Sequence, residues 1–277
     1  GVQTCALPIY LSFLRYPEYF SRRKNFWHAA LSVKKTLRQA SAIVAVSENT
    51  KMDVVELAGV SPDKVQVIYS GNNLSGEFLP EAERSQLLAQ AGLSAPFILY
   101  VGNIEPRKNI VGLIRAFEAL KKTPAGEGLL LVLAGASGWK NRAIYRAWRT
   151  SPYRDDIRFL GYVTKEMKQA LYGAAKVFAY PSFYEGFGFP PLEAMAYGVP
   201  VVCANVSSLP EVVGGAAITV DPDSPEEIAL AIGEIMRDPE LAADLSRAGR
   251  ERAALFSWDK AAAAYLQLFR ELTNKQR

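Results

Sequence analysis

The sequence predicts an α/β protein built on a doubly wound parallel sheet. Short apolar segments alternate with stretches in which apolar residues recur at helical spacing. The predicted strands are 97–101, 129–134, 157–160, 177–180 and 199–203. Helical patterns such as 110–120 and 165–174 separate them, and this alternation is typical of a parallel sheet covered by helices. Because such sheets bind ligands beyond the carboxyl ends of their strands, we expect site residues in the loops that follow the strands.

Length and composition set the first limits. The chain has 277 residues, of which 49% are hydrophobic, enough for one complete domain and part of another. Its net charge of +4 is too small to indicate a nucleic-acid partner, although it is compatible with a phosphate-bearing ligand. The two cysteines, Cys5 and Cys203, indicate no disulfide framework and fit a reducing compartment. No apolar run approaches the roughly 18 residues of a membrane span.

Residues 1–9 look foreign to the rest of the chain. They have neither the basic start nor the long apolar stretch of a signal peptide, and they are not an obvious strand. They read like one frame of a translated sequencing-library adapter, so we expect a non-native, adapter-derived segment and exclude Cys5 from functional argument. Native genomic codons for these nine residues would refute this hypothesis.

The next part of the chain predicts two helices and two strands. Residues 22–40 predict a basic amphipathic helix, with apolar positions at Phe26, Ala29, Ala30, Val33 and Leu37. Its basic side suits either contact with an anionic membrane or lipid-linked acceptor, or simple exposure to solvent. The only histidine, His28, has no acidic partner at helical spacing and is expected to be structural. Strands are predicted at 42–46 and 65–69, with a helix capped by Ser47 that runs to about Leu57.

Residues 79–95 are polar and predict an interdomain linker region. The end of the chain predicts three helices, at 224–238, 239–255 and 258–272.

The loop that follows the predicted strand 177–180 carries the strongest chemical signal. Pro190 and Pro191 favour a helix start, where unpaired N–H groups and the helix dipole attract a phosphate. Gly186 and Gly188 allow a ligand to approach the backbone. Glu185 and Glu193 frame this loop, and carboxylates accept hydrogen bonds from hydroxyls. The combination suits a sugar joined to a phosphate.

Two other loops are candidates for the same site. Arg107 and Lys108 stand in the loop after 97–101, where an arginine can grip a phosphate with two hydrogen bonds and a lysine adds a point charge. The alternative is a solvated pair of charges. The segment 135–138, Gly-Ala-Ser-Gly, follows the next strand, and it is either part of the site or only a tight turn.

The segment from Glu185 to Glu193 resembles the two-glutamate motif of the retaining family-four glycosyltransferases of the GT-B fold, and its flanks 180–182 and 198–202 match too. The resemblance implies a complete C-terminal Rossmann-like donor domain over 96–256 and a remnant of an N-terminal, acceptor-side Rossmann-like domain over 10–78. It implies that residues 257–277 form a helix bracing the first domain. The segment 207–214 also matches, as a neighbour of the donor site, although a capped helical turn explains it equally well.

The resemblance also implies site roles. The expected catalytic residues are Arg107, Lys108 and Glu185, with the two cations on the donor diphosphate and Glu185 on sugar hydroxyls. The expected donor-binding residues are Gly102, Asn103, Leu160, Gly161, Gly186, Phe187, Gly188, Leu192 and Glu193. Among these, the main chain of Leu160 and Gly161 would read the base and Glu193 would hold the ribose. Some members have an arginine where this chain has Asn103. No metal and no other cofactor are expected.

The implied reaction transfers a sugar from a nucleotide diphosphate sugar to a hydroxyl with retention. The motifs most resemble bacterial mannosyl- or rhamnosyl-type transferases of surface polysaccharide assembly, so we expect GDP-mannose as donor and a glycan or lipid-linked acceptor. The expected location is the cytoplasm, with peripheral contact at the inner face of the plasma membrane as a further expectation. The alternatives are a non-hydrolysing sugar-nucleotide epimerase and an inactive sugar-nucleotide-binding fragment, since the glycine-rich loop and histidine of the family's first domain have no counterpart here.

Overall fold

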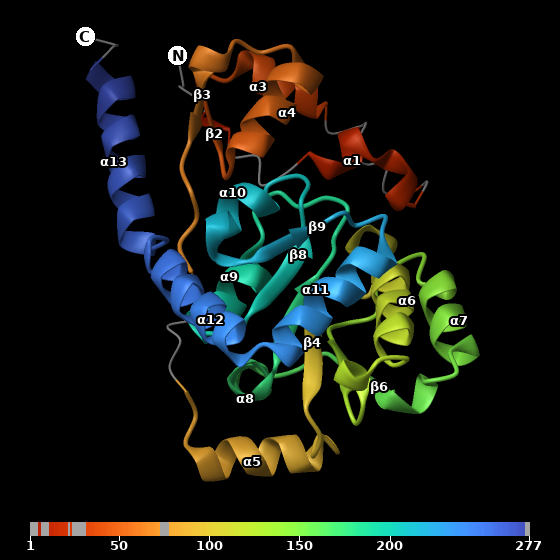
Figure 1. Cartoon of the computed structure of the whole chain (residues 1–277). Helices are drawn as coiled ribbons and strands as arrows, with labels where there is room; N and C mark the ends of the chain where they lie inside the picture. The colour runs from red at the N-terminus through yellow and green to blue at the C-terminus, as the bar shows by residue number, and fades with distance from the viewer. Residues whose placement is uncertain (1–4, 7–10, 22, 24–31, 73–77, 275–277) are drawn as a thin grey trace.

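The computed structural model describes residues 5–6, 11–21, 23, 32–72 and 78–274. These residues form two parallel sheets, and Figure 1 shows the smaller sheet above the larger one with helices around both. The smaller sheet has the order β1 (Cys5–Ala6), β2 (Ala42–Ala45) and β3 (Val65–Val67). The larger sheet has the order β6 (Ile157–Gly161), β5 (Leu130–Ala134), β4 (Phe97–Val101), β7 (Val177–Tyr180), β8 (Val201–Ala204) and β9 (Ile218–Val220).

The larger sheet confirms the predicted doubly wound parallel architecture. From β4 the chain builds outward through β5 to β6, and it then returns to the other side of β4 to add β7, β8 and β9. All neighbouring strands pair in parallel, and the order therefore reverses between β4 and β7. A crevice forms at such a reversal because the loops leave in opposite directions. All five strands predicted from the sequence are present, and β9 is additional.

The helices of the described residues are α1 (Ser12–Arg15), α3 (Val33–Gln39), α4 (Glu48–Ala58), α5 (Glu81–Gln90), α6 (Ile110–Leu120), α7 (Arg142–Thr150), α8 (Lys165–Ala174), α9 (Phe189–Ala196), α10 (Leu209–Val213), α11 (Pro225–Arg237), α12 (Pro239–Ala254) and α13 (Trp258–Asn274). The predicted helices at 110–120 and 165–174 match α6 and α8, and the ends of the three predicted C-terminal helices match those of α11, α12 and α13 to within two residues.

Side-chain caps explain where several of these helices start. The side chain of Ser47 accepts a hydrogen bond from the Thr50 N–H, as predicted, and Asn109 and Thr164 cap α6 and α8 in the same way. Each cap satisfies an N–H group that has no partner inside the helix. The helices α6 and α8 that follow β4 and β6 therefore begin at defined residues next to the strand ends.

Two parts of the chain differ from the sequence-based expectation. The predicted linker region 79–95 contains the helix α5, which packs against α8. The helix α7 was not predicted either, although its exposed arginines, Arg142, Arg146 and Arg149, recur at helical spacing and Ile144 is buried.

The N-terminal predictions fall partly outside the described residues. Cys5 and Ala6 form β1 and pair with β2, although the sequence of 1–9 is not an obvious strand, while residues 1–4 and 7–9 are not described. Of the predicted helix 22–40, the structure describes α3, in which Leu37 is buried. Phe26, His28, Ala29 and Ala30 lie outside the described residues.

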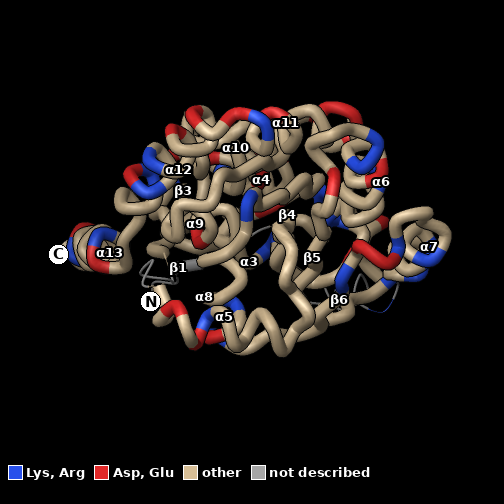
Figure 2. Tube along the Cα trace, turned by 60° about the horizontal axis from the view of Figure 1, so that its bottom comes forward, with Lys and Arg blue, Asp and Glu red and all other residues tan. Residues whose placement is uncertain are grey.

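The main core lies on both faces of the larger sheet, and its largest fully buried side chains include Tyr100, Tyr180, Phe117 and Phe178. The last helix, α13, packs Ala261 and Leu268 against Ala42, Val44 and Ile68 near the smaller sheet. Basic and acidic residues are mixed along most helices (Figure 2). Among the described residues, no helix has both the length and the apolar character needed to cross a bilayer.

Three glycines end the adjacent strands β4, β5 and β6 in a tight arrangement. The Gly102 N–H donates to the Ala134 carbonyl at 2.9 Å, and the Gly135 N–H donates to the Gly161 carbonyl at 2.7 Å. Gly102 and Gly135 both have a φ of +154°, which L-residues rarely adopt. A Cβ on Gly135 would lie 1.9 Å from the Gly102 carbonyl oxygen, so the backbones approach more closely than any side chain permits.

We expect Gly135→Ala to lower the free energy of unfolding by more than about 2 kcal/mol, because the clash is with backbone and the φ angle disfavours alanine. Urea unfolding measures this loss. Gly215→Ala is the matched control, since a Cβ there meets no atom within 4 Å. The control should stay within about 0.5 kcal/mol of the wild type. Equal stabilities of the two variants would contradict this account of the strand ends.

Candidate active site

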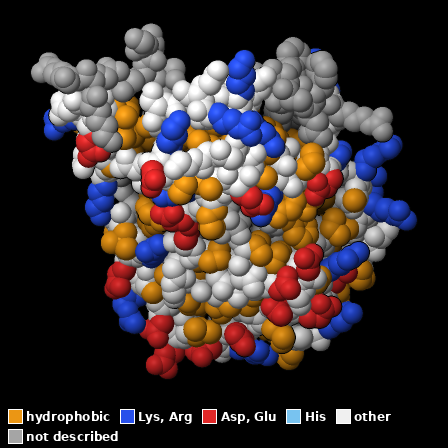
Figure 3. Space-filling model, turned by 90° about the horizontal axis from the view of Figure 1, so that it is seen from above, with side chains coloured by type: hydrophobic (Ala, Val, Ile, Leu, Met, Phe, Trp, Pro, Cys, Tyr) orange, Lys and Arg blue, Asp and Glu red, His pale blue; other side chains and the backbone are white. Residues whose placement is uncertain are grey.

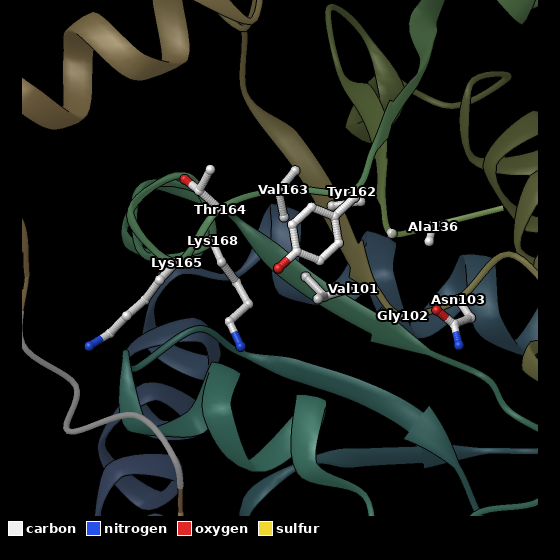
Figure 4. Close-up of a pocket in the computed structure, with 11 residues that line it drawn as sticks. Val101, Gly102, Asn103, Ala136, Tyr162, Val163, Thr164, Lys165 and Lys168 are labelled. Atoms are coloured by element: carbon white, nitrogen blue, oxygen red, sulfur yellow. The ribbon is translucent and has the colours of Figure 1, made fainter.

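A cavity of about 540 Å³ opens at the carboxyl ends of β4, β5 and β6. One side is backbone, from Gly102, Asn103 and the start of the loop after β5, and the other side is the segment 162–165 with Lys168. In Figure 4 the ring of Tyr162 lies between Lys168 and Asn103. The cavity therefore stands beside the reversal of strand order, where the parallel sheet predicts a ligand.

The predicted base-binding residues lie next to this cavity rather than in its wall. Leu160 is partly buried against the core, and the Gly161 carbonyl accepts the hydrogen bond from the Gly135 N–H. The residues that follow them, Tyr162 to Lys165, line the cavity instead. Gly102 and Asn103, which are also predicted to bind the donor, do line it.

Lys168 joins the cavity to the buried carboxylate of Glu193. Its Nζ lies 3.0 and 3.1 Å from the two carboxylate oxygens, and the hydroxyl of Tyr172 donates to Oε2 at 3.0 Å. Burial, and then the Glu193 charge, raises the pKa of Tyr172 well above its usual range, so this hydroxyl keeps its proton and remains a donor. Glu193 is thus held in one orientation. Sequence reasoning missed Lys168, because a lysine on a surface helix carries no distinctive signal.

The predicted catalytic residues meet in a second, buried cluster, which we call the ion cluster: Arg107, Lys108 and Glu185. The Lys108 Nζ lies 2.6 Å from Glu185 Oε1, and an Arg107 guanidinium nitrogen lies 3.1 Å from the same oxygen. All three residues are buried, at 7 to 8% relative exposure. The structure therefore brings these residues together, with the two cations paired to the carboxylate.

Neighbouring groups hold the two cations in place. A second guanidinium nitrogen of Arg107 lies 2.7 Å from Glu105 Oε1, and Arg107 also donates to the Tyr184 carbonyl. Lys108 donates to the Tyr180 hydroxyl at 2.5 Å and lies 4.9 Å from the centre of that ring. Glu105 is only 1% exposed and was not among the predicted site residues. Its place two residues before Arg107 was the available signal.

The electrostatics of the cluster follow from burial and from this pairing. Burial alone would raise the pKa of Glu185, but Lys108 and Arg107 outweigh it and hold that pKa at about 2. Burial lowers the pKa of Lys108, and the Glu185 charge opposes this effect. At neutral pH the cluster is therefore an ion pair with an additional arginine, and each charge depends on the others.

The glycine loop after Glu185 is oriented by its carbonyl groups. The Gly186 carbonyl accepts hydrogen bonds from the Ser47 and Thr50 hydroxyls at 2.7 and 3.1 Å. The Ser208 hydroxyl donates to the Glu185 and Phe187 carbonyls at 3.0 and 2.8 Å. Among the described residues, the N–H groups of residues 186–188 donate to no acceptor. The loop thus keeps these donors available, as its glycine-rich sequence predicts.

Two other predicted donor-binding residues lie in the packed interior. The Leu192 side chain is fully buried in the core, and its N–H donates to the Gly188 carbonyl at 3.4 Å. Phe187 is 3% exposed, and its ring packs against Phe189 and Phe256. These two side chains therefore anchor the loop in the hydrophobic core.

The segment 207–214 supports the loop as well as turning the chain. The Glu185 N–H donates to the Ser207 hydroxyl at 3.0 Å, and the short helix α10 follows at Leu209–Val213. The helical turn is therefore present, but its N-cap residue Ser208 makes no side-chain cap hydrogen bond.

The N-terminal residues contact the same loop. The Tyr184 hydroxyl donates to the Asp53 carboxylate, and the Tyr184 ring lies 5.4 Å from that of Tyr16. The Glu48 N–H donates to Glu211 Oε1 at 2.9 Å. The site therefore lies where the two sheets and their helices meet. No group of three or more His, Cys, Asp or Glu side chains suited to a metal ion occurs among the described residues.

We expect the ionised Glu185 to stabilise the fold above about pH 4.5 and to lose this contribution as the pH falls toward 2, because its folded-state pKa of about 2 lies below the ordinary value of 4.5. The gap corresponds to roughly 3 kcal/mol. Glu185→Gln should therefore destabilise the chain most at neutral pH, and its difference from the wild type should shrink toward pH 2 in urea unfolding. A difference that does not change with pH would refute the pairing.

Comparison with known proteins places the chain in a family. Residues 88–252 match the model "Glycosyl transferases group 1", and residues 8–75 match "Glycosyltransferase Family 4". The chain is 34% identical over 268 residues to the O-antigen chain mannosyltransferase B of Escherichia coli, covering 95% of this chain and 68% of that protein. It is 31% identical to the serotype-specific mannosyltransferase WbdA of Escherichia coli, covering 90% of this chain and only 31% of that protein.

Solved structures support the fold. The crystal structure of Anabaena Alr3699/HepE in complex with UDP and glucose superposes with a TM-score of 0.81 at 21% sequence identity, over 96% of this chain and 71% of that one. The predicted GT-B fold is therefore confirmed. The family model "Glycosyl transferases group 1" matches more than half of the chain, and the chain covers 68% of the O-antigen chain mannosyltransferase B. The protein therefore belongs to the glycosyl transferases group 1, as its two-glutamate motif predicts.

Proposed function

We propose that this chain provides the donor site of a retaining transferase that moves a sugar, mannose from GDP-mannose, to a hydroxyl acceptor. The observation that carries the proposal is that Arg107 and Lys108 both meet Glu185, which directly precedes residues 186–188, whose N–H groups donate to no acceptor among the described residues. These groups supply positive charge and hydrogen-bond donors in a buried setting. A diphosphate leaving group needs both, because it gains negative charge as the glycosidic bond breaks.

The remaining predicted roles follow from where each carboxylate lies. Glu193, fixed by Lys168 and Tyr172 next to the cavity, would accept hydrogen bonds from the ribose. Glu185, next to the cations, would accept them from the sugar hydroxyls. Both residues position the donor. The charge of the leaving diphosphate is met by protein cations and N–H groups, so we propose a reaction that requires no metal.

The mannose and acceptor assignments rest on the relatives. The two Escherichia coli proteins are named as mannosyltransferases, one of them of the O-antigen chain, whereas the Anabaena structure contains UDP and glucose. We therefore propose a glycan or lipid-linked acceptor in surface polysaccharide synthesis.

Lys34, Lys35 and Arg38 are exposed on α3, and we propose that they contact the anionic lipids at the cytoplasmic face of a membrane. On the face shown in Figure 3, apolar, basic and acidic side chains are mixed.

We expect GDP to bind the 277-residue chain more tightly than UDP, and Glu193→Ala to weaken nucleotide binding at least about tenfold, or 1.4 kcal/mol, in calorimetric titration. The reason is the loss of the carboxylate that faces the ribose. Glu166→Ala is the control, because this exposed glutamate stands on the same helix as Lys168 and outside the cavity wall.

The outcomes separate the candidate functions. Tighter binding of UDP would replace mannose with a glucose-type donor. Conversion of a nucleotide sugar without any acceptor would instead support an epimerase. If a folded sample binds neither nucleotide, the donor-site assignment is wrong.

A further inference from the structure

The diphosphate-binding cations are neutralised in the structure by a group of the protein itself. Lys108 and Arg107 both reach the same oxygen, Oε1 of Glu185, at 2.6 and 3.1 Å. A carboxylate oxygen and a phosphate oxygen are the same kind of acceptor for these donors. An incoming diphosphate must therefore compete with Glu185 for both cations.

We propose that Glu185 is an internal counterion, which occupies the place of a donor phosphate oxygen and leaves it when the diphosphate binds. This inference rests on the proposed function. Before binding, Glu185 keeps the two buried cations charged and ordered. After the exchange, its carboxylate is released from them and becomes available to the hydroxyls of the sugar. One residue thus performs two tasks in sequence, and the second begins only when a diphosphate is present.

The cations have supports that do not depend on Glu185. Arg107 is held by Glu105 Oε1 at 2.7 Å and by the Tyr184 carbonyl, and Lys108 by the Tyr180 hydroxyl. Glu105 Oε2 is buried and has no hydrogen-bond partner among the described residues. A buried carboxylate oxygen without a donor is costly. It is a spare acceptor for an N–H group of the cations once Glu185 has turned away.

The backbone of Glu185 is fixed while its side chain makes the exchange. Its N–H donates to the Ser207 hydroxyl at 3.0 Å, and its carbonyl accepts from the Ser208 hydroxyl at 3.0 Å. Rotation of the side chain is therefore sufficient, and the loop at 186–188 keeps its N–H groups in position.

Removing a true counterion should raise the affinity for diphosphate and lower the kcat with a nucleotide sugar. Without the Glu185 charge, the cations lose one of their anionic partners, while Glu105 still pairs with Arg107, and they gain more from a phosphate. Affinity for inorganic diphosphate, which carries neither ribose nor sugar, should rise about tenfold in Glu185→Gln, measured by calorimetric titration of the full chain. The kcat with a nucleotide sugar should fall, because the hydroxyl acceptor is lost. A residue with a purely structural role would weaken both.

Three further variants complete the experiment. Lys108→Gln should bind diphosphate more weakly than the wild type, because it removes one of the two cations. Glu251→Gln is the isosteric control, since this carboxylate is exposed on α12 and lies outside both the ion cluster and the cavity wall, and it should leave diphosphate affinity unchanged. If Glu185→Gln does not fold without ligand, Glu185→Asp replaces it, with a shorter reach to Lys108 and an intermediate gain in affinity. The rise of the melting temperature with added diphosphate should also be larger in Glu185→Gln than in the wild type.

The two proposals fail in different ways. If the wild type binds a nucleotide in a manner that Glu193→Ala weakens, but Glu185→Gln binds diphosphate no more tightly, the counterion role is overturned and the proposed function stands. If Glu185→Gln gains diphosphate affinity but no chain binds a nucleotide, the proposed function is overturned, and only the exchange of Glu185 for a diphosphate remains.

Discussion

The pairing of two buried cations with one carboxylate oxygen is the constraint on which the rest of the site depends. Arg107 and Lys108 follow β4, and Glu185 follows β7, so their ion pairs connect loops that leave two adjacent strands. Charges are tolerated in such a setting only when they are paired and hydrogen-bonded. Neither loop is therefore free to shift without exposing an uncompensated charge in the other.

The parallel sheet places these loops, and the N-terminal elements orient them. Strands β4 and β7 pair in parallel, so their carboxyl ends open at the same edge and on either side of the reversal in strand order. The Ser47 side chain caps α4 and also donates to the Gly186 carbonyl. The residue that starts a helix near the smaller sheet thus turns the glycine loop of the larger one, which leaves the N–H groups of residues 186–188 for a ligand.

Much of the fold and part of the site could be predicted, for identifiable reasons. The strands β4, β5, β7 and β8 are buried runs of apolar residues, and helices such as α6 combine a capping residue with a regular apolar face, so local sequence was sufficient. The helices α5 and α7 were not predicted; α5 consists mostly of polar residues, whereas α7 carries its arginines on one exposed side, a periodic pattern that was available in the sequence. Arg107, Lys108 and Glu185 were found through motifs. Lys168 was not found, because its partner Glu193 is distant in the sequence. Glu105 was not found, because its burial beside Arg107 is visible only in the folded chain.

What the sequence determined by itself is the alternation of strands and helices, the family motif, and the identity of the charged residues at the strand ends. These depend on local hydrogen bonding, on periodic burial and on short spacing, all of which are written in consecutive residues. Only the tertiary structure decided that both cations share one oxygen of Glu185, and that Lys168 holds Glu193. The physical reason is that an ion pair depends on distance and desolvation, and both are created when loops from separate strands are packed together.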